Sequence, residues 1–189
     1  LFANVGSISP SYQPGHAHAD ELSFELFYKG APLIVNTGVS TYEKNDRRLL
    51  ERSTQSHNCV VSGSNSIDVW SGFRVGKRAN VKIDLDDHQK LKAEHDGFGT
   101  ITARIFDGTV TGEMTITDEL VYQSNSKGYY GKGFLHFHPD VHIEQIDEAT
   151  FLINNQIKLS FNCEKNPSII ELENYSYAKG YNTLIDATV

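Results

Sequence analysis

Three histidines, a carboxylate and a carboxamide lie close together in the first third of the chain. His16, His18 and Asp20 stand in the run GHAHAD, Asn36 follows in VNTG, and His57 stands in SHN. Imidazole nitrogens and carboxylate or amide oxygens can bind Zn²⁺, and imidazoles also transfer protons in catalysis. If residues 16–20 are extended, side chains two apart lie on one face about 7 Å apart. The pattern predicts a site in which one histidine holds a metal while its neighbour faces a substrate.

Each of these residues also has a purely structural interpretation, and other motifs resemble sites less closely. Asp20 is expected to orient an imidazole rather than to bind a metal, or else to cap a turn. A second H-x-H, His136 and His138, alternates with apolar residues and is expected to face solvent from a strand. Trp70 and Phe73 could form a platform for stacking sugars, but aromatic residues of a β-sandwich more often fill its core, and we expect them there.

Composition restricts the class of protein. The chain has 189 residues, 39% of them hydrophobic, and no internal repeat, so we expect one domain spanning residues 1–189. The net charge of −7 argues against a broad surface for nucleic acid or membrane, and no apolar run is long enough to span a bilayer. The chain opens on what reads as an interior strand, without a signal peptide, so we expect it to be cut from a longer protein.

Positive charge gathers locally near the histidines. Six basic residues lie close to them in sequence: Arg47, Arg48, Arg52, Arg74, Lys77 and Arg78. Such a cluster on an acidic chain favours an anionic ligand, although loop charges that are merely solvated give the same pattern.

The hydrophobic pattern has a period of two almost throughout. Apolar and polar residues alternate over 22–28, 81–86 and 157–162, which predicts strands with one solvated face. Tight reversals with positive φ are expected at 29–30, 96–97, 107–108 and 154–155. Only residues 45–55 favour a helix, with Asn45 or Asp46 as its cap. The expected fold is all-β, a sandwich of two antiparallel sheets with little helix.

Several motifs, in order, resemble those of a known family. The runs GHAHADELSFELFYKGAPLIVNTGVSTY, RRLLERSTQSHNCVVSG and VWSGFRVGKRA are similar to the C-terminal β-sandwich domain of heparinase II/III-like polysaccharide lyases, a family that includes heparinases and alginate lyases. The resemblance is strongest over residues 12–80. It implies a supersandwich-like fold and, in the full-length protein, an N-terminal (α/α) toroid of helices that is absent from this chain and that packs on the sandwich along the substrate groove.

The resemblance also implies roles for particular residues. His16 matches a histidine that faces the sugar at the cleavage site, and Tyr42 falls where some relatives place a tyrosine near the substrate. His18 and His57 match ligands of a structural zinc. The third ligand is usually an aspartate, and Asn36 stands in its place. An amide oxygen is a neutral and weaker donor than a carboxylate, so zinc binding is expected to be weakened.

Lyases of this kind cleave uronic-acid polysaccharides such as glycosaminoglycans or alginate by β-elimination. We expect His16 and Tyr42 to take part in proton transfer, and Arg48, Arg52 and Arg74 to contact the acidic substrate. In the family, further essential groups come from the helical domain, so the isolated chain is expected to be inactive. The resemblance implies a periplasmic or extracellular location in a bacterium. The alternatives are a non-catalytic carbohydrate-binding or scaffold domain of polysaccharide processing or biosynthesis, and a small metal-dependent β-barrel enzyme.

Overall fold

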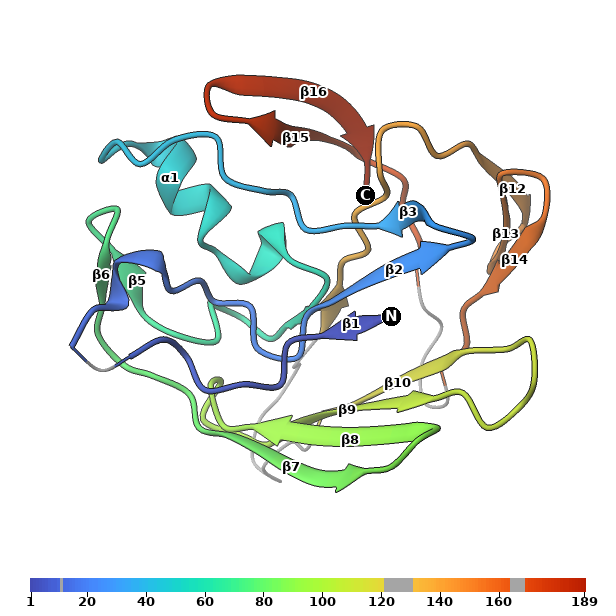
Figure 1. Ribbon diagram of the computed structural model, residues 1–189, viewed down its shortest axis with the longest axis horizontal. Coiled ribbons are helices and arrows are strands. Elements are labelled where there is room, and N and C mark those ends of the chain that lie inside the picture. The colour runs from blue at the N-terminus through green and yellow to red at the C-terminus, as the bar shows by residue number, and fades with distance from the viewer. Residues whose placement is uncertain (11, 121–130, 164–168) are drawn as a thin grey trace.

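The computed structural model describes residues 1–10, 12–120, 131–163 and 169–189. Within these ranges the structure is almost entirely β, and every strand pair is antiparallel (Figure 1). One α-helix, α1, and two 3₁₀ turns, η1 and η2, complete the regular structure of the described residues. None of the helices in these ranges has the length and apolarity needed to cross a membrane. The expectation of an all-β antiparallel fold with little helix is confirmed.

The elements follow one another along the chain with short connections. Their bounds are β1 Phe2–Ala3, η1 Pro14–His16, β2 Phe24–Tyr28, β3 Ala31–Ile34, α1 Asp46–Glu51, η2 Thr54–Ser56, β4 Val60–Val61, β5 Val69–Trp70, β6 Arg74–Val75, β7 Val81–Asp86, β8 Lys90–His95, β9 Thr102–Asp107, β10 Thr115–Leu120, β11 Lys132–Gly133, β12 Ile143–Asp147, β13 Thr150–Ile153, β14 Ile157–Ser160, β15 Asn174–Gly180 and β16 Thr183–Thr188.

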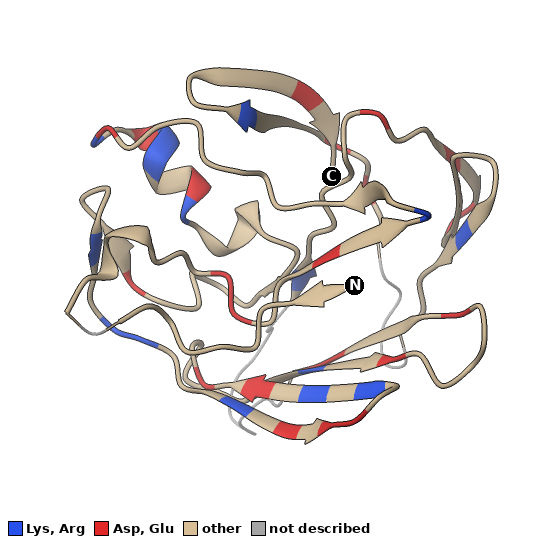
Figure 2. Ribbon diagram, viewed as in Figure 1, with Lys and Arg blue, Asp and Glu red and all other residues tan. Residues whose placement is uncertain are grey.

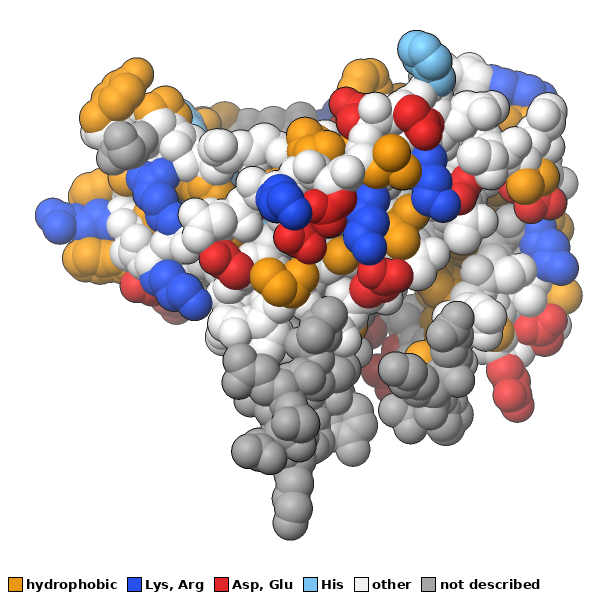
Figure 3. All heavy atoms as spheres, turned by 90° about the horizontal axis from the view of Figure 1, so that it is seen from below, with side chains coloured by type: hydrophobic (Ala, Val, Ile, Leu, Met, Phe, Trp, Pro, Cys, Tyr) orange, Lys and Arg blue, Asp and Glu red, His pale blue; other side chains and the backbone are white. Residues whose placement is uncertain are grey.

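The strands form layers, but their hydrogen bonding is divided among several sheets. The largest sheet has the order β10-β9-β8-β7, and a three-stranded sheet β1-β2-β3 lies across from it (Figure 1). A second three-stranded sheet, β12-β13-β14, and the pairs β15-β16, β5-β6 and β11-β4 complete the described pairing. β7 and β8 each carry both acidic and basic residues (Figure 2), and the face seen from below mixes both signs of charge (Figure 3). This sheet therefore offers no single-sign surface to a charged ligand.

The main core lies between these layers. Phe24 of β2 meets Phe106 of β9 edge to face, with ring centroids 5.7 Å apart, and Phe151 of β13 is buried in the same cluster. Burying a side chain of this size stabilises the fold by about 1.5–3 kcal/mol. The strand expected over residues 22–28 begins only at Phe24, because Leu22 has a positive φ of 60° and lies outside it.

Local signals located the helix and two of the four reversals. Helix α1 begins after Asn45, whose side chain accepts a hydrogen bond from the amide of Arg48 at 2.9 Å, so the cap prediction is confirmed. Positive φ occurs at 29–30 and 154–155 as expected. Near the reversals predicted at 96–97 and 107–108, positive φ occurs further along the chain, at Gly99 and Gly112, because longer loops replace the tight turns.

Candidate functional site

The segment that carries His16 and His18 turns instead of running as a strand. Pro14–His16 form the 3₁₀ turn η1, in which the amide of Ala17 donates to the carbonyl of Pro14 at 3.0 Å. His16 therefore does not meet the condition that residues 16–20 are extended, whereas Ala17 does, so the alternation argument does not relate His16 to His18. His16 is exposed, whereas His18 is half-buried between two buried alanines.

His57 is fully buried and is held in place by its neighbour Asn58. The amide nitrogen of Asn58 donates to backbone carbonyls at the start of β2 and just after β3, at 2.7 and 3.0 Å. Its oxygen accepts from the backbone amide of His136 at 2.7 Å. Arg104 on β9 donates to the carbonyl of Asn58 and so ties this loop to the large sheet. His136 itself is buried rather than solvent-facing, so the expectation for the second H-x-H is wrong at His136, while His138 is half-buried.

Four polar side chains form a chain of hydrogen bonds through the site. Nη1 of Arg48 lies 3.3 Å from Nε2 of His18, and Nδ1 of His18 lies 3.3 Å from Nε2 of His57. Nδ1 of His57 then lies 3.2 Å from Oδ1 of Asn36. The same oxygen accepts from the amide of Gly38 at 3.3 Å. His18, Asn36 and His57 are thus brought together from three separate segments, as the sequence predicted.

The direction of these hydrogen bonds follows from the first donor. A guanidinium can only donate, so Nε2 of His18 accepts and its proton sits on Nδ1. That proton is donated to Nε2 of His57, whose own proton on Nδ1 is donated to the Asn36 oxygen. Along this series of hydrogen bonds from Arg48 to Asn36, every donor meets an acceptor while both imidazoles stay neutral.

Electrostatics agree with neutral imidazoles. Burial, together with the nearby charges of Arg48 and Arg52, lowers the pKa of His18 from 6.5 to about 4. Burial lowers the pKa of His57 well below its ordinary value, with further contributions from His18 and His136. Both rings are therefore uncharged near neutral pH, and the two arginines would repel a proton on His18.

A zinc ion shared by the three expected ligands does not fit this arrangement. The 3.3 Å between the two facing nitrogens would suit a tetrahedral ion, because zinc–nitrogen bonds are about 2 Å long. However, the Asn36 oxygen lies beside the other nitrogen of His57, so the three donors do not converge on one point. A lone pair on Nδ1 of His18 would also leave its Nε2 proton facing the Arg48 donor.

The exposed part of the site consists of His16 and Tyr42. Their rings meet edge to face with centroids 5.6 Å apart, and Tyr42 is 55% exposed. The guanidinium of Arg48 lies under the Tyr42 ring, 4.9 Å from its centroid. The structure thus places the two residues expected at the groove side by side, and Arg48 connects them to the buried histidines.

Helix α1 positions the buried arginines, and Glu51 anchors the helix. Oε1 of Glu51 accepts from the amide and the hydroxyl of Ser40 and, at 2.8 Å, from Nε of Arg47. Glu51 was not predicted from the sequence. The available signal was its i,i+4 spacing from Arg47, which identifies the ion pair but not the contact with Ser40.

Arg48 and Arg52 bind backbone carbonyls rather than solvent. Arg48 donates to the carbonyls of Gly15 and Gly72, at 3.3 and 3.2 Å. Arg52 donates to the carbonyl of Ala17 at 2.8 Å and to those of Trp70 and Arg74 at 3.4 and 3.1 Å. Both arginines are 0% exposed, so their burial argues against the predicted direct contact with a substrate.

Arg74, the third arginine expected at the substrate, has a different position. It is exposed on β6, and its guanidinium lies 5.1 Å from the centroid of the Trp70 ring and 5.9 Å from that of Phe73. Trp70 and Phe73 are 46% and 53% exposed, which corrects the expectation that they fill the core.

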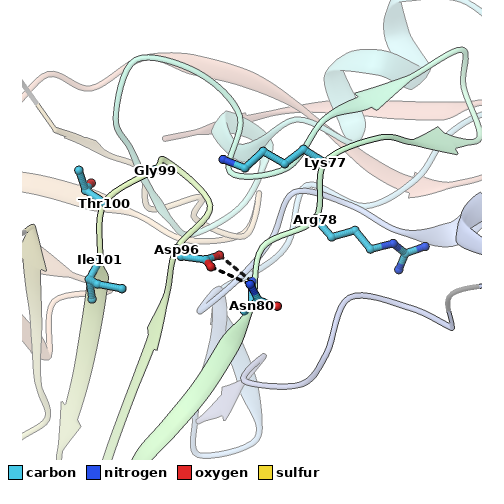
Figure 4. Close-up of a pocket in the computed structure, with 7 residues that line it drawn as sticks. All are labelled: Lys77, Arg78, Asn80, Asp96, Gly99, Thr100 and Ile101. Carbon is cyan, nitrogen blue, oxygen red and sulfur yellow. Dashed lines mark hydrogen bonds between the residues drawn. The ribbon is translucent and has the colours of Figure 1, made fainter.

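Two of the cavities on the described surface bear on the expected site. One, of about 190 Å³, is lined by His16, His18, Asp20 and Glu21 together with part of the segment 4–9. Asp20 therefore lies beside the imidazoles, and burial raises its pKa to about 6. The other cavity, of about 470 Å³, contains none of the expected site residues. In this cavity the Asp96 carboxylate accepts hydrogen bonds from Asn80, and the Arg78 side chain points away from the cavity (Figure 4).

Comparison with solved structures identifies the architecture. The chain superposes on a mutant of the heparan sulfate lyase HepC from Pedobacter heparinus with a TM-score of 0.68 and 14% identity, over 97% of this chain and 28% of that one. A second HepC structure from the same organism gives 0.61 and 16%, over 92% and 27%. At this identity the likeness shows the fold, and the chain spans little more than a quarter of either enzyme.

The sequence comparisons identify the family. No curated protein sequence matches the chain. The family profile described as heparinase II/III-like, C-terminal matches residues 1–188, almost the whole chain. The chain therefore belongs to the heparinase II/III-like family and corresponds to its C-terminal domain.

Proposed function

We propose that this domain is the β-sandwich part of a polysaccharide lyase that cleaves a uronic-acid-containing chain by β-elimination. The observation that carries the proposal is the exposed pair of His16 and Tyr42, which stands on a rigid buried support in a member of this family. Heparan sulfate, the polymer named for the HepC enzymes, is the first substrate to test, and alginate is the second.

The chemistry requires two proton transfers on neighbouring atoms. The bond from C5 of the uronate to hydrogen breaks, its electron pair forms the C4–C5 double bond, and the C4–O bond breaks with a proton delivered to the leaving oxygen. An imidazole and a phenol in edge contact can serve as this base and acid, because each can accept or donate a proton and the two groups lie side by side. Among the described residues, His16 and Tyr42 can transfer protons, are exposed, and lie beside the hydrogen-bonded histidines His18 and His57.

Elimination also requires neutralisation of the uronate carboxylate, which makes the C5 proton acidic. Arg48 and Arg52 are closed off by their carbonyl partners, so neither supplies this charge from its present position. We propose that this group comes from outside the chain, which spans only 28% of the HepC chain that it resembles. The 189-residue chain alone is then inactive, while the longer protein that contains it is active.

The test follows the ultraviolet absorbance of the conjugated double bond that elimination creates. The longer protein is assayed on heparan sulfate, alginate and other acidic glycans. His16→Ala should lower kcat by about 10²-fold or more, the usual contribution of a positioned acid or base. A folded His16→Ala protein with the turnover of the unmodified enzyme would remove His16 from the mechanism.

A carbohydrate-binding domain without catalysis is the second candidate, and the exposed aromatic pair of Trp70 and Phe73 favours it. The same assay separates the two functions. A protein that binds acidic glycans but generates no absorbing product, across the whole panel, is a binding module.

A further inference from the structure

The turn between β5 and β6 displays aromatic side chains that the fold does not bury. Trp70 pairs with Arg74 across the hairpin, and Ser71 and Gly72 take positive φ values of 53° and 72° at its tip. Trp70 and Phe73 remain half exposed, although both are large enough to stabilise a core substantially. Exposed aromatic groups gathered in one place commonly mark a binding surface.

This hairpin is fixed to the histidine segment by the two buried arginines. Arg48 joins the carbonyl of Gly15 to that of Gly72, and Arg52 joins the carbonyl of Ala17 to those of two hairpin residues. The contact is close, because a methyl group added to Gly15 would lie 3.9 Å from Cβ of Phe73. The aromatic hairpin is thus a rigid extension of the turn that ends at His16.

The hairpin combines flat apolar surface with one exposed positive charge. The Arg74 guanidinium lies within reach of both rings, at 5.1 and 5.9 Å from their centroids. β6 is coloured as Lys or Arg in Figure 2, and in Figure 3 hydrophobic and basic side chains lie together at the end of the molecule that holds β5 and β6. On a chain of net charge −7, this is a local reversal of sign.

We propose that Trp70, Phe73 and Arg74 form a subsite for a second acidic sugar, next to the sugar held at His16 and Tyr42. The aromatic faces pack against the apolar face of the sugar ring, and the guanidinium pairs with its carboxylate or sulfate, for which a planar fork is well shaped. This inference rests on the proposed function for the class of ligand, but it concerns binding rather than chemistry.

Trp70 is the single tryptophan of this chain, so its fluorescence reports directly on the subsite. The 189-residue chain is titrated with heparan sulfate and alginate oligosaccharides and with a neutral oligosaccharide of equal length. At least one acidic oligosaccharide should change the emission saturably, and the neutral one should not. Arg74→Met should weaken binding about tenfold, as expected for loss of a central contact, and Arg74→Lys should weaken it less. Val110→Ala, in the exposed β9–β10 turn, is the matched control and should bind normally.

Kinetics on the longer protein distinguish this inference from the proposed function. Trp70→Ala should raise KM about tenfold with kcat retained, and Trp70→Phe should restore most of the loss because a flat ring remains. Acidic oligosaccharides that leave Trp70 emission unchanged, or a Trp70→Ala enzyme with normal KM, would overturn the subsite while leaving catalysis intact. Saturable perturbation of Trp70 in a protein without lyase activity would instead support the subsite and refute the proposed reaction.

Discussion

Nη1 of Arg48 lies 3.3 Å from Nε2 of His18, so a permanent cation contacts a neutral imidazole at the centre of the site. The positive charge is surrounded by acceptors, namely the carbonyls of Gly15 and Gly72 and the face of the Tyr42 ring. Arg48 therefore fixes the tautomers of the buried histidines and supports the exposed tyrosine at the same time. In this arrangement a fixed guanidinium stands beside the histidines to which the family resemblance assigns a metal ion.

We expect the protein to hold well below one zinc per chain when it is purified without chelator and examined by elemental analysis. The Arg48 donor keeps the proton of His18 on the nitrogen that zinc would need, and two nearby arginines repel a cation. Arg48→Met should raise zinc affinity in calorimetric titration. Asn36→Asp alone should not, because its oxygen lies beside the other nitrogen of His57. Stoichiometric zinc in the unmodified protein would show that Arg48 leaves His18 and that the ligand prediction was right.

Arg52→Met should destabilise the domain by about 3 kcal/mol or more, because it leaves three buried or half-buried carbonyls without their donor. Urea unfolding measures this change. Arg52→Lys should recover only part of the loss, since one ammonium cannot reach the same spread of acceptors. Arg74→Met removes an exposed arginine and is the control, with little expected change. A similar stability for Arg52→Met and Arg74→Met would mean that the carbonyl contacts of Arg52 contribute nothing.

Glu21 should make stability depend on pH in a direction opposite to that of the buried histidines. Burial raises its pKa from 4.5 to about 7, and one of its oxygens has no partner among the described residues. Since the folded state holds the proton more tightly, the neutral carboxyl favours folding below pH 4.5, and this advantage is lost as the pH rises through 7. Glu21→Gln should therefore gain stability relative to the unmodified protein between pH 5 and pH 8, on the order of 3 kcal/mol. If the two proteins differed in unfolding free energy by the same amount at every pH, the burial of an uncharged Glu21 would be contradicted.

The sequence predicted features that depend on neighbours along the chain. The cap at Asn45, the strand at 81–86, the reversal at 29–30 and the strand expected at 157–162, which ends at Ser160, follow from side-chain chemistry acting over a few residues. The proximity of His18, Asn36 and His57 was predicted from resemblance rather than from spacing. The order in which hydrogen bonds join His18, His57 and Asn36 could not be predicted, because it depends on which imidazole nitrogen faces each neighbour.

Features that depend on backbone partners from distant segments were predicted poorly. Arg48 and Arg52 were expected at the substrate because a cationic side chain suits an anion, but backbone carbonyls provide most of their contacts and have no sequence signature. His136 alternates with apolar residues like a surface position, yet the oxygen of Asn58 makes its burial favourable. Trp70 looks like a core residue by composition, yet it lies on a short hairpin and is exposed.

Tyr42 offers a test that separates proton transfer from packing. Its ring covers the Arg48 guanidinium and meets the His16 ring, so the ring has a structural role. The hydroxyl has a role of its own only if it transfers a proton in the reaction. Tyr42→Phe keeps both ring contacts and should leave stability and oligosaccharide binding nearly unchanged, but it should lower kcat of the longer protein by about 10²-fold if the phenol transfers a proton. Tyr42→Ala removes the ring as well and should also lower stability and raise KM, because Arg48 loses one of its acceptors. Equal kcat values for Tyr42→Phe and the unmodified enzyme would confine Tyr42 to supporting His16 and Arg48, and proton transfer would then require another group beside His16.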